Sequence, residues 1–403
     1  MPRTTHRHQF RCPSRCQPGE QEMTELAPTA LAARHSRVDR VRQRMGAQGV
    51  EVLLLSHGAD LPWLTGYRAM PLERLTLLVL PLVGDPVLVV PGLEAPRVAG
   101  GGDLFSLRAW SDAEDPVDLV VDLVRSSMSG CFALSDRAWA STVLALQARL
   151  PAARWVAAST VTSPIRAIKD DAEVAALRAA GGAADRVASL LQSGGIPLVG
   201  RTEAAVSADL ASQLVAEGHN AVNFAIVGSG PNAASPHHEP GDRIIGRDET
   251  VVCDFGGSLS LDGDIGYCSD ITRTVVTGTP STEVQGCYDV LLEAQQAAVG
   301  AAHAGVTAAS VDKVARDIIE DAGYGHLFVH RTGHGIGIEE HEDPYLVVGN
   351  EEMLVPGHAF SVEPGIYLPG KFGMRLEDIV VIGSDGGPES LNTVDHSLVT
   401  VDH

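Results

Sequence analysis

Along the first part of the chain, apolar residues fall into short continuous runs that are separated by turn-forming residues. These runs are rich in Val and Leu and predict β-strands at VEVLLLS (50–56), RLTLLVLP (74–81) and PVLVVP (86–91). Residues 115–128 instead space their apolar side chains three and four positions apart, which predicts an amphipathic helix. Because strand-like and helix-like runs alternate over residues 36–160, we expect an α/β domain there.

A boundary between two domains is predicted near residues 163–180. Pro164 should end the element before it, since proline interrupts a regular helix or strand. Asp170 or Asp171 can then cap a helix that runs toward Gly194, because an N-cap carboxylate accepts hydrogen bonds from the free amides of the first turn. A new unit of structure should therefore begin shortly after Pro164.

The C-terminal half of the chain repeats one order of elements. A second helix is predicted to start at Thr202, with Val206, Leu210 and Leu214 on one face and Gly218 past its end. The segments that follow are a strand-rich region at 222–278, helices at 282–304 and 310–322, and strands at 326–382. Two helices followed by a sheet region thus occur twice.

The two strand-rich regions also share a local pattern. In RDETVVCDFGG (247–257) and LVPGHAFSVEPG (354–365), a turn leads into an apolar strand, an acidic residue and a nearby glycine. Each is followed by another strand that bears an acid, SDITRTVV (269–276) and MRLEDIVVI (374–382). The repeat predicts two hairpins that face each other across a pseudo-twofold axis.

Composition narrows the class of protein. The chain of 403 residues is 44% hydrophobic and 20% charged, which is typical of soluble globular domains. Its net charge of −21 argues against a nucleic-acid partner, since phosphates need a basic surface. The most apolar stretch, residues 75–92, is broken by Gly84 and Pro86, so it predicts two strands and a turn rather than a membrane span.

Two further features bear on the compartment. Residues 1–22 carry basic charge but no apolar run, so we expect a disordered extension rather than a signal peptide. Cys12 and Cys16 have the spacing of half a zinc site, but no second half lies nearby. The remaining cysteines show no paired framework: Cys131, Cys253, Cys268 and Cys287. We interpret these four as reduced thiols of a cytoplasmic protein.

The candidate chemistry lies in four acids that are set among apolar neighbours: Asp254, Asp270, Glu363 and Glu377. A single acid in such a strand usually lies on a solvated face, because unpaired charge in an apolar setting is very costly. Four acids in two matched hairpins indicate a cluster instead. Carboxylates cannot cluster by themselves, since like charges repel and raise one another's pKa. Two divalent cations would balance the four charges, so the pattern predicts a dinuclear metal centre.

His334 lies in a glycine-rich segment, RTGHGIGIEEHEDP (331–344), and can supply a nitrogen ligand to this centre. We interpret Gly333, Gly335 and Gly337 as residues that let the backbone approach the metal centre closely. A site of four carboxylates and one imidazole favours Mn²⁺, with Co²⁺ or Zn²⁺ also possible. Two such ions that share a bridging water lower its pKa and make a hydroxide at neutral pH, which is hydrolytic chemistry.

Several of these motifs together resemble a known family. They are, in order, SDITRT (269–274), HRTGHGIGIEEHEDP (330–344), SVEPGIY (361–367) and RLEDIVVI (375–382). In this order they resemble the pita-bread metallopeptidases, in the branch of aminopeptidase P and prolidase that acts on Xaa-Pro bonds. SGPNAASPHHEPGDR (229–243) is similar to the upstream histidine segment of that branch, and PWLTGY (62–67) to a signature of its creatinase-like N-terminal domain. The resemblance covers about residues 36–385.

The resemblance implies a fold, a division of the chain and a set of partners. Residues 23–165 would form an α/β creatinase/prolidase-like domain, and residues 166–403 an α+β pita-bread catalytic domain with pseudo-twofold symmetry. The partner would be a proline-containing peptide substrate, with no nucleic acid and no membrane, and the chain would form a homodimer.

The resemblance also implies roles for individual residues. The five metal ligands would be Asp254, Asp270, His334, Glu363 and Glu377. His237 matches the histidine that contacts the reacting peptide, His330 and His341 match histidines on the substrate side, and Arg375 matches an arginine beside the bridging glutamate. Asp262 and Asp264 lie in an insert that is longer than usual for the family and could compete with Asp254. We favour Asp254, because its flanks fit the pattern of strand followed by glycine.

Other activities within the same fold stay open on the sequence alone. Creatinase-like relatives hydrolyse other C–N bonds without these ligands, and some pita-bread domains bind partners without a metal. The presence of all five ligands counts against both. Methionine aminopeptidase lacks this N-terminal domain. An aminopeptidase and a dipeptidase differ in what closes the far end of the cleft, which one sequence does not reveal.

Overall fold

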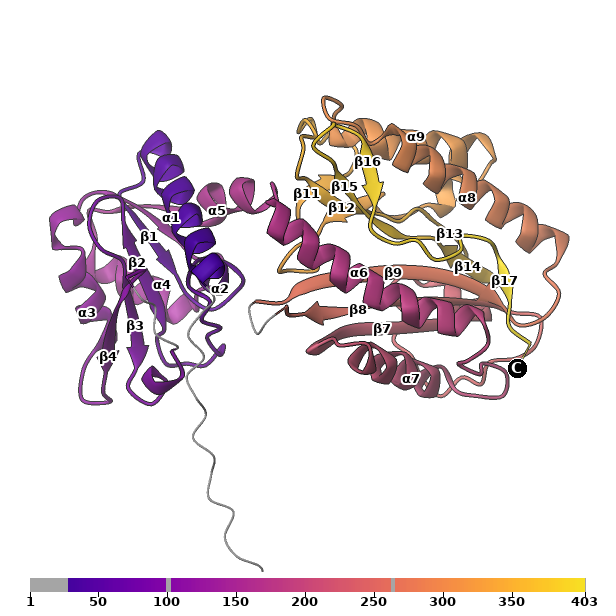
Figure 1. Cartoon of the computed structure of the whole chain (residues 1–403), viewed down its shortest axis with the longest axis horizontal. Helices are drawn as coiled ribbons and strands as arrows, with labels where there is room; N and C mark the ends of the chain where they lie inside the picture. The colour runs from indigo at the N-terminus through magenta and orange to yellow at the C-terminus, as the bar shows by residue number, and fades with distance from the viewer. Residues whose placement is uncertain (1–27, 99–102, 262–264, 403) are drawn as a thin grey trace, which may run out of the picture.

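The computed structural model describes residues 28–98, 103–261 and 265–402. Two bodies, each built around β-sheet, follow one another along the chain; helix α5 (Ser159–Arg166) packs on the first, and helix α6 (Asp171–Gln192) lies across the second (Figure 1). The predicted disordered extension at 1–22, with Cys12 and Cys16, lies outside the described residues, and so do Asp262 and Asp264. No helix in the described ranges is long and apolar enough to cross a membrane.

The N-terminal body is built on one six-stranded sheet with the strand order β4-β3-β2-β1-β5-β6. Its strands are β1 (Val52–Leu55), β2 (Leu77–Pro81), β3 (Val87–Pro91), β4 (Ser106–Trp110), β5 (Cys131–Leu134) and β6 (Arg154–Ala157). The first three confirm the strands predicted from the apolar runs. β1 pairs antiparallel with β2 and parallel with β5.

Helices cover both faces of this sheet, which explains why its central strands are continuous apolar runs. Leu53 and Leu55 of β1 pack with α1 (Pro28–Gln48), α2 (Asp60–Thr65) and α5 on one face. Val52 and Leu54 pack with α3 (Pro116–Leu123) and α4 (Ala140–Arg149) on the other. The Asp115 side chain accepts a hydrogen bond from the Val117 amide and caps α3. The helix predicted at 115–128 is therefore present but ends at Leu123, before a short 3-10 turn, η2 (Arg125–Ser127).

The prediction that Pro164 would break the preceding element is wrong, because Pro164 lies inside α5. A proline in a helix leaves the carbonyl four residues earlier without its usual amide donor. Here that carbonyl belongs to Thr160, and it accepts hydrogen bonds from Arg44 Nε at 3.1 Å and Gln48 Nε2 at 2.9 Å. Side chains of α1 thus replace the missing donor.

The C-terminal body contains two larger sheets and one small hairpin. A four-stranded sheet has the order β17-β9-β8-β7, and a five-stranded sheet has the order β11-β10-β12-β15-β16. Strands of the first are β7 (Ala221–Ser229), β8 (Thr250–Leu259), β9 (Tyr267–Val276) and β17 (Val399–Thr400). Strands of the second are β10 (Gly333–Gly335), β11 (Glu342–Leu346), β12 (Ala359–Val362), β15 (Asp378–Ile382) and β16 (Pro388–Ser390). The hairpin consists of β13 (Gly365–Leu368) and β14 (Phe372–Arg375).

Each larger sheet is covered by its own pair of helices (Figure 1). α6 and α7 (Glu203–Ala216) pack on the four-stranded sheet, and α8 (Thr282–Ala301) and α9 (Ala308–Asp321) pack on the five-stranded sheet. Asp170 caps α6 in a reciprocal capping box with Glu173, and Thr202 caps α7. The predicted order of two helices and a sheet, repeated twice, is confirmed.

The two repeats meet at the acidic strands. β8 and β9 form the predicted hairpin, with Asp254 opposite Thr272. The second region differs from a simple hairpin, since β12 pairs with β15 and the β13–β14 hairpin is inserted between them. The amide of Glu377 donates to the carbonyl of Thr272 at 3.2 Å and joins the two repeats. This junction brings the four predicted acids to one place.

Candidate metal centre

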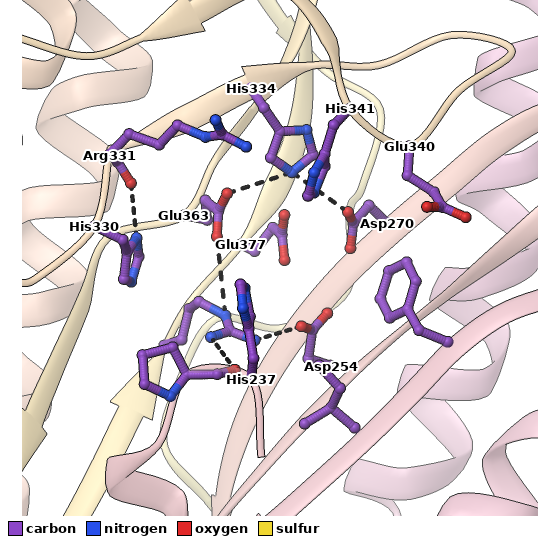
Figure 2. A pocket seen from close by; sticks show the side chains of 14 residues that line it. His237, Asp254, Asp270, His330, Arg331, His334, Glu340, His341, Glu363 and Glu377 are labelled. Carbon is purple, nitrogen blue, oxygen red and sulfur yellow. Dashed lines mark hydrogen bonds and ion pairs between the residues drawn. The ribbon is translucent and has the colours of Figure 1, made fainter. Parts of the chain in front are cut away.

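A cavity of about 530 Å³ opens where the two repeats meet. It is lined by every site residue that the sequence predicts: His237, Asp254, Asp270, His330, His334, His341, Glu363, Arg375 and Glu377. Figure 2 shows these side chains converging from strands and loops of both repeats. Five further residues complete the lining, namely Phe224, Ile226, Pro236, Arg331 and Glu340.

The acids reach this cavity from strands of both sheets. Asp254 lies within β8 and Asp270 within β9, while Glu363 directly follows β12 and Glu377 directly precedes β15. All but Glu363, which is half-buried, are buried. The strands set these carboxylates among apolar neighbours, so each depends on polar partners within the cavity.

His334 is presented to the acids in a form that suits a metal ligand. Its Nδ1 lies 3.1 Å from the carbonyl oxygen of Gly335, which can only accept, so Nδ1 carries the proton. Nε2 then directs a lone pair at Asp270 Oδ2, 3.6 Å away, and at Glu363 Oε1, 3.3 Å away. Burial, followed by repulsion from His341, lowers the pKa of His334 to about 3, which keeps the ring neutral.

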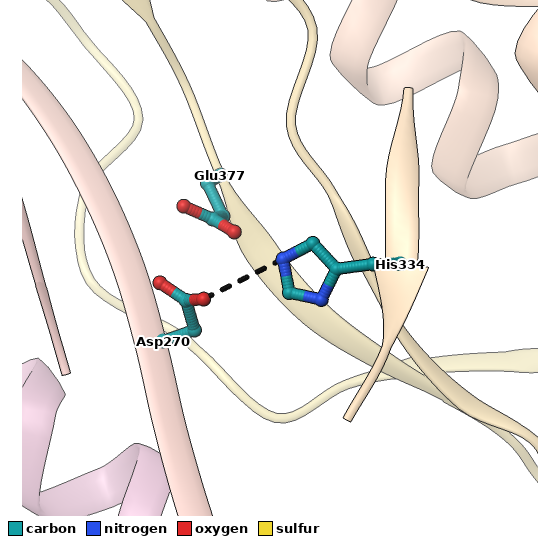
Figure 3. A group of neighbouring side chains, drawn as sticks. All are labelled: Asp270, His334 and Glu377. Carbon is teal, nitrogen blue, oxygen red and sulfur yellow. Dashed lines mark ion pairs between the residues drawn. The ribbon is translucent and has the colours of Figure 1, made fainter. Parts of the chain in front are cut away.

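Asp270, His334 and Glu377 form the tightest group (Figure 3). One ligand atom from each lies within 4.8 Å of the others. A neutral imidazole and two carboxylates so close together have no attraction for one another, whereas a divalent cation that accepts both oxygen and nitrogen ligands can bind all three. Among the described residues, this is where three potential ligands come within reach of one ion.

The acids also lack partners that buried oxygens normally have. Asp254 Oδ1, Asp270 Oδ1 and Glu377 Oε1 are buried without a hydrogen-bond partner in the described part of the chain. Burial and the neighbouring carboxylates raise the pKa of Asp270 and of Glu377 well above their ordinary values. Burial raises the pKa of Glu363 to about 7, although Arg375 opposes this. The donor set therefore fits cations, which would satisfy the free oxygens and offset the repulsion.

Arg375 is one of two arginines that line this cavity, and its main partner is Asp254. It forms an ion pair with Asp254 Oδ2, and its Nε lies 4.0 Å from Glu363 Oε2. Arg375 thus lies near a glutamate of the predicted ligand set and makes a closer contact with Asp254. Arg375 also donates to the Thr272 hydroxyl at 3.1 Å, and Thr272 donates to Glu377 Oε2 at 2.6 Å.

The three cavity histidines other than His334 differ in how they are held. The His341 ring packs on the His334 ring with centroids 4.1 Å apart, and His237 follows the 3-10 helix η3 (Gly230–Ala234) on an exposed segment. His330 has partners on both nitrogens, since Nδ1 donates to Arg331 O at 2.7 Å and Nε2 accepts from the Tyr367 hydroxyl at 2.8 Å. Burial and nearby Arg375 lower the pKa of His330 to about 4.

The interpretation of the glycines around His334 is corrected by the structure. A Cβ on Gly333 would lie 1.8 Å from Ser361 O, and one on Gly335 would lie 2.2 Å from Asp343 O. A Cβ on Gly337 would lie 2.4 Å from Glu342 Oε1. Gly333 and Gly335 therefore allow β10 to approach its neighbouring strands rather than the metal centre itself, and Gly337 leaves room for the Glu342 carboxylate.

The arrangement of both bodies matches known proteins over most of the chain. A family model described as Creatinase/Prolidase N-terminal domain matches residues 37–168, and one described as Metallopeptidase family M24 matches residues 174–384. The chain belongs to metallopeptidase family M24. The N-terminal body of this M24 peptidase is thus a creatinase-type domain and the C-terminal body a pita-bread domain, as predicted from the motifs.

Several proteins that are similar to this M24 peptidase in sequence or structure are named as dipeptidases or prolidases. The probable dipeptidase PepE of Mycobacterium tuberculosis is 45% identical over 357 residues, which cover 88% of this chain and 92% of the relative. The Xaa-Pro dipeptidase of Lactobacillus helveticus is 36% identical over 360 residues, covering 87% and 95%. The crystal structure of recombinant prolidase from Thermococcus sibiricus superposes with a TM-score of 0.85 at 35% identity, covering 91% and 98%.

Sequence reasoning missed two side chains that organise the site of the M24 peptidase. Tyr367 links Arg375 to His330, since its oxygen accepts from Arg375 Nη1 at 3.0 Å. Glu203, at the start of α7, is fully buried and holds the segment on both sides of His237 through Ser229, Asn232 and His238, whose Nε2 lies 2.7 Å away. Tyr367 belongs to the quoted motif SVEPGIY, whereas Glu203 has no local signal, because an acid in the first turn of a helix is ordinary.

The cysteine prediction can be compared with the structure as well. Cys131, Cys253, Cys268 and Cys287 are free and buried. Burial raises the pKa of the Cys253, Cys268 and Cys287 thiols to about 12. These three thiols therefore stay protonated and unreactive near neutral pH.

The acid cluster predicts how the metal-free protein responds to pH. A carboxyl group whose pKa rises on folding contributes full stability below its unfolded pKa and loses that contribution as pH rises through the folded pKa. For Glu363 the window runs from 4.5 to about 7, and Asp270 and Glu377 act in the same direction. His330 and His334, whose pKa values are lowered, act in the opposite direction below about pH 6.5.

We therefore expect the melting temperature of chelator-treated protein to fall as the pH rises above about 7, where His330 and His334 are largely neutral in both states. Protein reloaded with a divalent cation should show a smaller fall, since the cation stabilises the ionised carboxylates. Thermal melts across this range check both expectations. A metal-free melting temperature that stays level or rises would show that the carboxylates do not repel one another as the geometry indicates.

Proposed function

We propose that this M24 peptidase hydrolyses the Xaa-Pro bond, in Xaa-Pro dipeptides or at the N-terminus of longer peptides. The observation that carries the proposal is the cluster of acids around His334, with free buried oxygens at the wall of a cavity of about 530 Å³. The names of two relatives, Xaa-Pro dipeptidase and prolidase, support the choice of bond. A cavity of this size suits a substrate of two or three residues.

We assign the predicted ligand set to two divalent ions, which would be Mn²⁺ first, with Co²⁺ or Zn²⁺ as alternatives. The set comprises Asp254, Asp270, His334, Glu363 and Glu377. When bound, such ions polarise the scissile carbonyl and supply a nucleophilic water near neutral pH. The residue roles, the dinuclear state and the metal stay proposals, as do a homodimer and a cytoplasmic location.

The chain's own side chains then have separate tasks. His237 and His341 line the cavity outside the ligand set and can donate hydrogen bonds to the oxygen of the scissile carbonyl as negative charge develops on it. Glu363 lines the same cavity, so its carboxylate can accept a proton from the attacking water and pass it to the departing proline nitrogen. Arg375 fixes Asp254 by their ion pair, and His330 fixes Tyr367 and the backbone at Arg331.

Arg331 favours a dipeptide over a longer substrate. Its guanidinium lies 4.4 Å above the centre of the Tyr345 ring and lines the cavity. In contrast to Arg375, it has no carboxylate partner within ion-pair distance among the described residues. A guanidinium that is held by an aromatic face and lacks an acid can bind the free carboxylate of a dipeptide.

The substitution Arg331→Gln tests this role. It should raise KM for Ala-Pro by about 10-fold or more, since hydrogen bonds between charged groups each contribute about 1.5–3 kcal/mol. KM for the amide Ala-Pro-NH₂, which carries no carboxylate, should change much less. Steady-state kinetics on the two substrates make the comparison, with metal content measured in parallel. Equal effects on both substrates would remove Arg331 as the carboxylate anchor.

The function itself is tested with a substrate panel. Purified protein should be assayed with Xaa-Pro dipeptides, longer Xaa-Pro-peptides, Xaa-Ala dipeptides, Met-peptides and creatine, each with Mn²⁺, Co²⁺ or Zn²⁺. We expect hydrolysis of Xaa-Pro dipeptides to be fastest and to stop with a chelator. Faster cleavage of Xaa-Ala or Met-peptides would change the assigned bond. Cleavage of creatine, or no cleavage at all with metal bound, would overturn the proposal.

A further inference from the structure

A network of buried charges joins the N-terminal domain to the segment that carries His341. Arg166, at the end of α5, has a side chain only 8% exposed and contacts three acids. Its Nη1 lies 2.9 Å from Asp60 Oδ1 of the N-terminal domain, and its Nη2 lies 2.8 Å from Glu339 Oε2. The same Nη2 also forms a short contact with Glu342 Oε2. One guanidinium thus ties α2 to both ends of residues 339–342.

Lys169 completes this network from the linker between α5 and α6. Its side chain is 1% exposed, and its Nζ lies 2.8 Å from Glu342 Oε1. Burial acts to raise the pKa of Glu342, but Lys169 and Arg166 outweigh it and hold the pKa below its ordinary value. Glu342 is therefore an ion with a cation on each oxygen. Such an arrangement is costly to build and is destabilised strongly when one partner is removed.

The position of Glu342 determines where the neighbouring His341 can lie. Glu342 begins β11 and pairs with Gly335, which directly follows His334. Its carboxylate occupies the space where a side chain on Gly337 would be. His341, one residue earlier, packs its ring on that of His334. An ionic anchor on Glu342 therefore fixes the backbone at the point from which the His341 side chain enters the cavity.

We propose that Arg166 and Lys169 are positioning residues, which hold residues 339–342 through Glu342 and Glu339 and so set His341 against His334. The N-terminal domain would then contribute to the active site without reaching the substrate. The structural part of this proposal stands on the contacts alone, whereas its effect on rate rests on the proposed function.

Hydrogen exchange tests the structural part without any assay of activity. Metal-loaded full-length protein carrying Glu342→Gln should exchange the amides of residues 336–343 faster than the wild type. A second variant, Lys169→Met with Glu342→Gln, removes one charge of each sign and covers the case in which Glu342→Gln alone folds poorly. The matched control is Glu173→Gln, which breaks another buried ion pair, to Arg37 at 3.2 Å; within the described residues Glu173 forms no hydrogen bond or ion pair with residues 339–342.

The control should leave exchange of residues 336–343 at the wild-type rate. If Glu173→Gln loosens that segment as much as the Glu342 variants do, the network supports the domain junction in general and the proposal is wrong. Unchanged exchange in both Glu342 variants would also overturn it. Elemental analysis of each protein confirms that the metal content is the same before the rates are compared.

A double-mutant cycle on kcat tests the link to His341. We expect Glu342→Gln to lower kcat about 10-fold or more in the wild type, since a small misplacement of a working group can cost up to about 100-fold. In the His341→Ala background the same change should have little effect, because the group being positioned is gone. Equal losses in both backgrounds would show that Glu342 does not act through His341.

The two experiments separate this proposal from the proposed function. If the wild type does not cleave Xaa-Pro substrates, the proposed function fails while the exchange data still decide the anchoring of residues 339–342. If His341→Ala keeps full kcat but Glu342→Gln loosens the segment, the anchor exists and the role of His341 is wrong.

Discussion

Replacing Asp270 by Asn or Glu377 by Gln is expected to remove bound metal and peptidase activity while raising the stability of the metal-free protein. These isosteric changes each delete one negative charge from a buried cluster. Partners of metal ligands already contribute roughly 10–100-fold to metal affinity, so direct ligands should cost more. Without metal, however, the pKa values of both acids are raised by burial and by neighbouring carboxylates, so losing a charge relieves repulsion.

The opposite signs of these two effects distinguish a metal site from a structural acid cluster. Metal stoichiometry, kcat and the melting temperature of chelator-treated protein should be measured for each variant at about pH 8, where the carboxylates are most strongly ionised. A variant that loses stability without metal, or that keeps full metal content, would contradict the assignment.

Asp378 provides a matched control, because it directly follows Glu377 but has a different environment. Its oxygens have three partners, Arg273 at 2.8 Å, Gln295 at 3.1 Å and His396 at 2.6 Å. Asp378→Asn would leave the fully buried guanidinium of Arg273 without its counter-ion. We therefore expect this variant to lower the melting temperature with or without metal, in contrast to Glu377→Gln.

The fold was largely predictable from periodicity, because the spacing of apolar residues differs between strands and helices and can be recognised within each segment. The strands at 52–55, 77–81 and 87–91 were visible as apolar runs, and the caps at Asp170 and Thr202 marked two helices. Contacts between distant segments were not visible. Pro164 could stay inside α5 only because side chains of α1 bind the carbonyl of Thr160, and no local pattern near Pro164 reports this.

In the candidate site too, features set by neighbouring residues in the sequence could be predicted, whereas features set by contacts between distant segments could not. The acids and His334 could be predicted because a charged side chain in an apolar strand is costly without a partner, and because the pattern of an apolar strand followed by an acid occurs twice. The glycines around His334 were misread, since their role depends on how closely β11 and β12 pass. Glu203, Arg166 and Glu342 were missed because each looks like an ordinary surface charge until the fold buries it.

His237→Ala and His341→Ala are expected to lower kcat on Xaa-Pro substrates by about 100-fold or more each, the range for groups that stabilise developing charge or transfer a proton. Both histidines line the cavity, and neither belongs to the group of Asp270, His334 and Glu377 that comes within reach of one ion. Metal content should therefore stay near that of the wild type, unlike in the Asp270 and Glu377 variants.

The matched control for the two cavity histidines is His326→Ala, an exposed histidine that does not line the cavity, and it should keep kcat and metal. His330→Ala should behave differently again, because both of its nitrogens already have partners within the protein. It should lower the melting temperature and raise KM more than it lowers kcat, since it releases Tyr367 and the backbone at Arg331.

Measuring kcat, KM and metal stoichiometry for the four variants separates these roles. If His237→Ala and His341→Ala both keep full kcat, the two histidines are structural. If they lose metal instead, they are ligands, and the set of five must be redrawn.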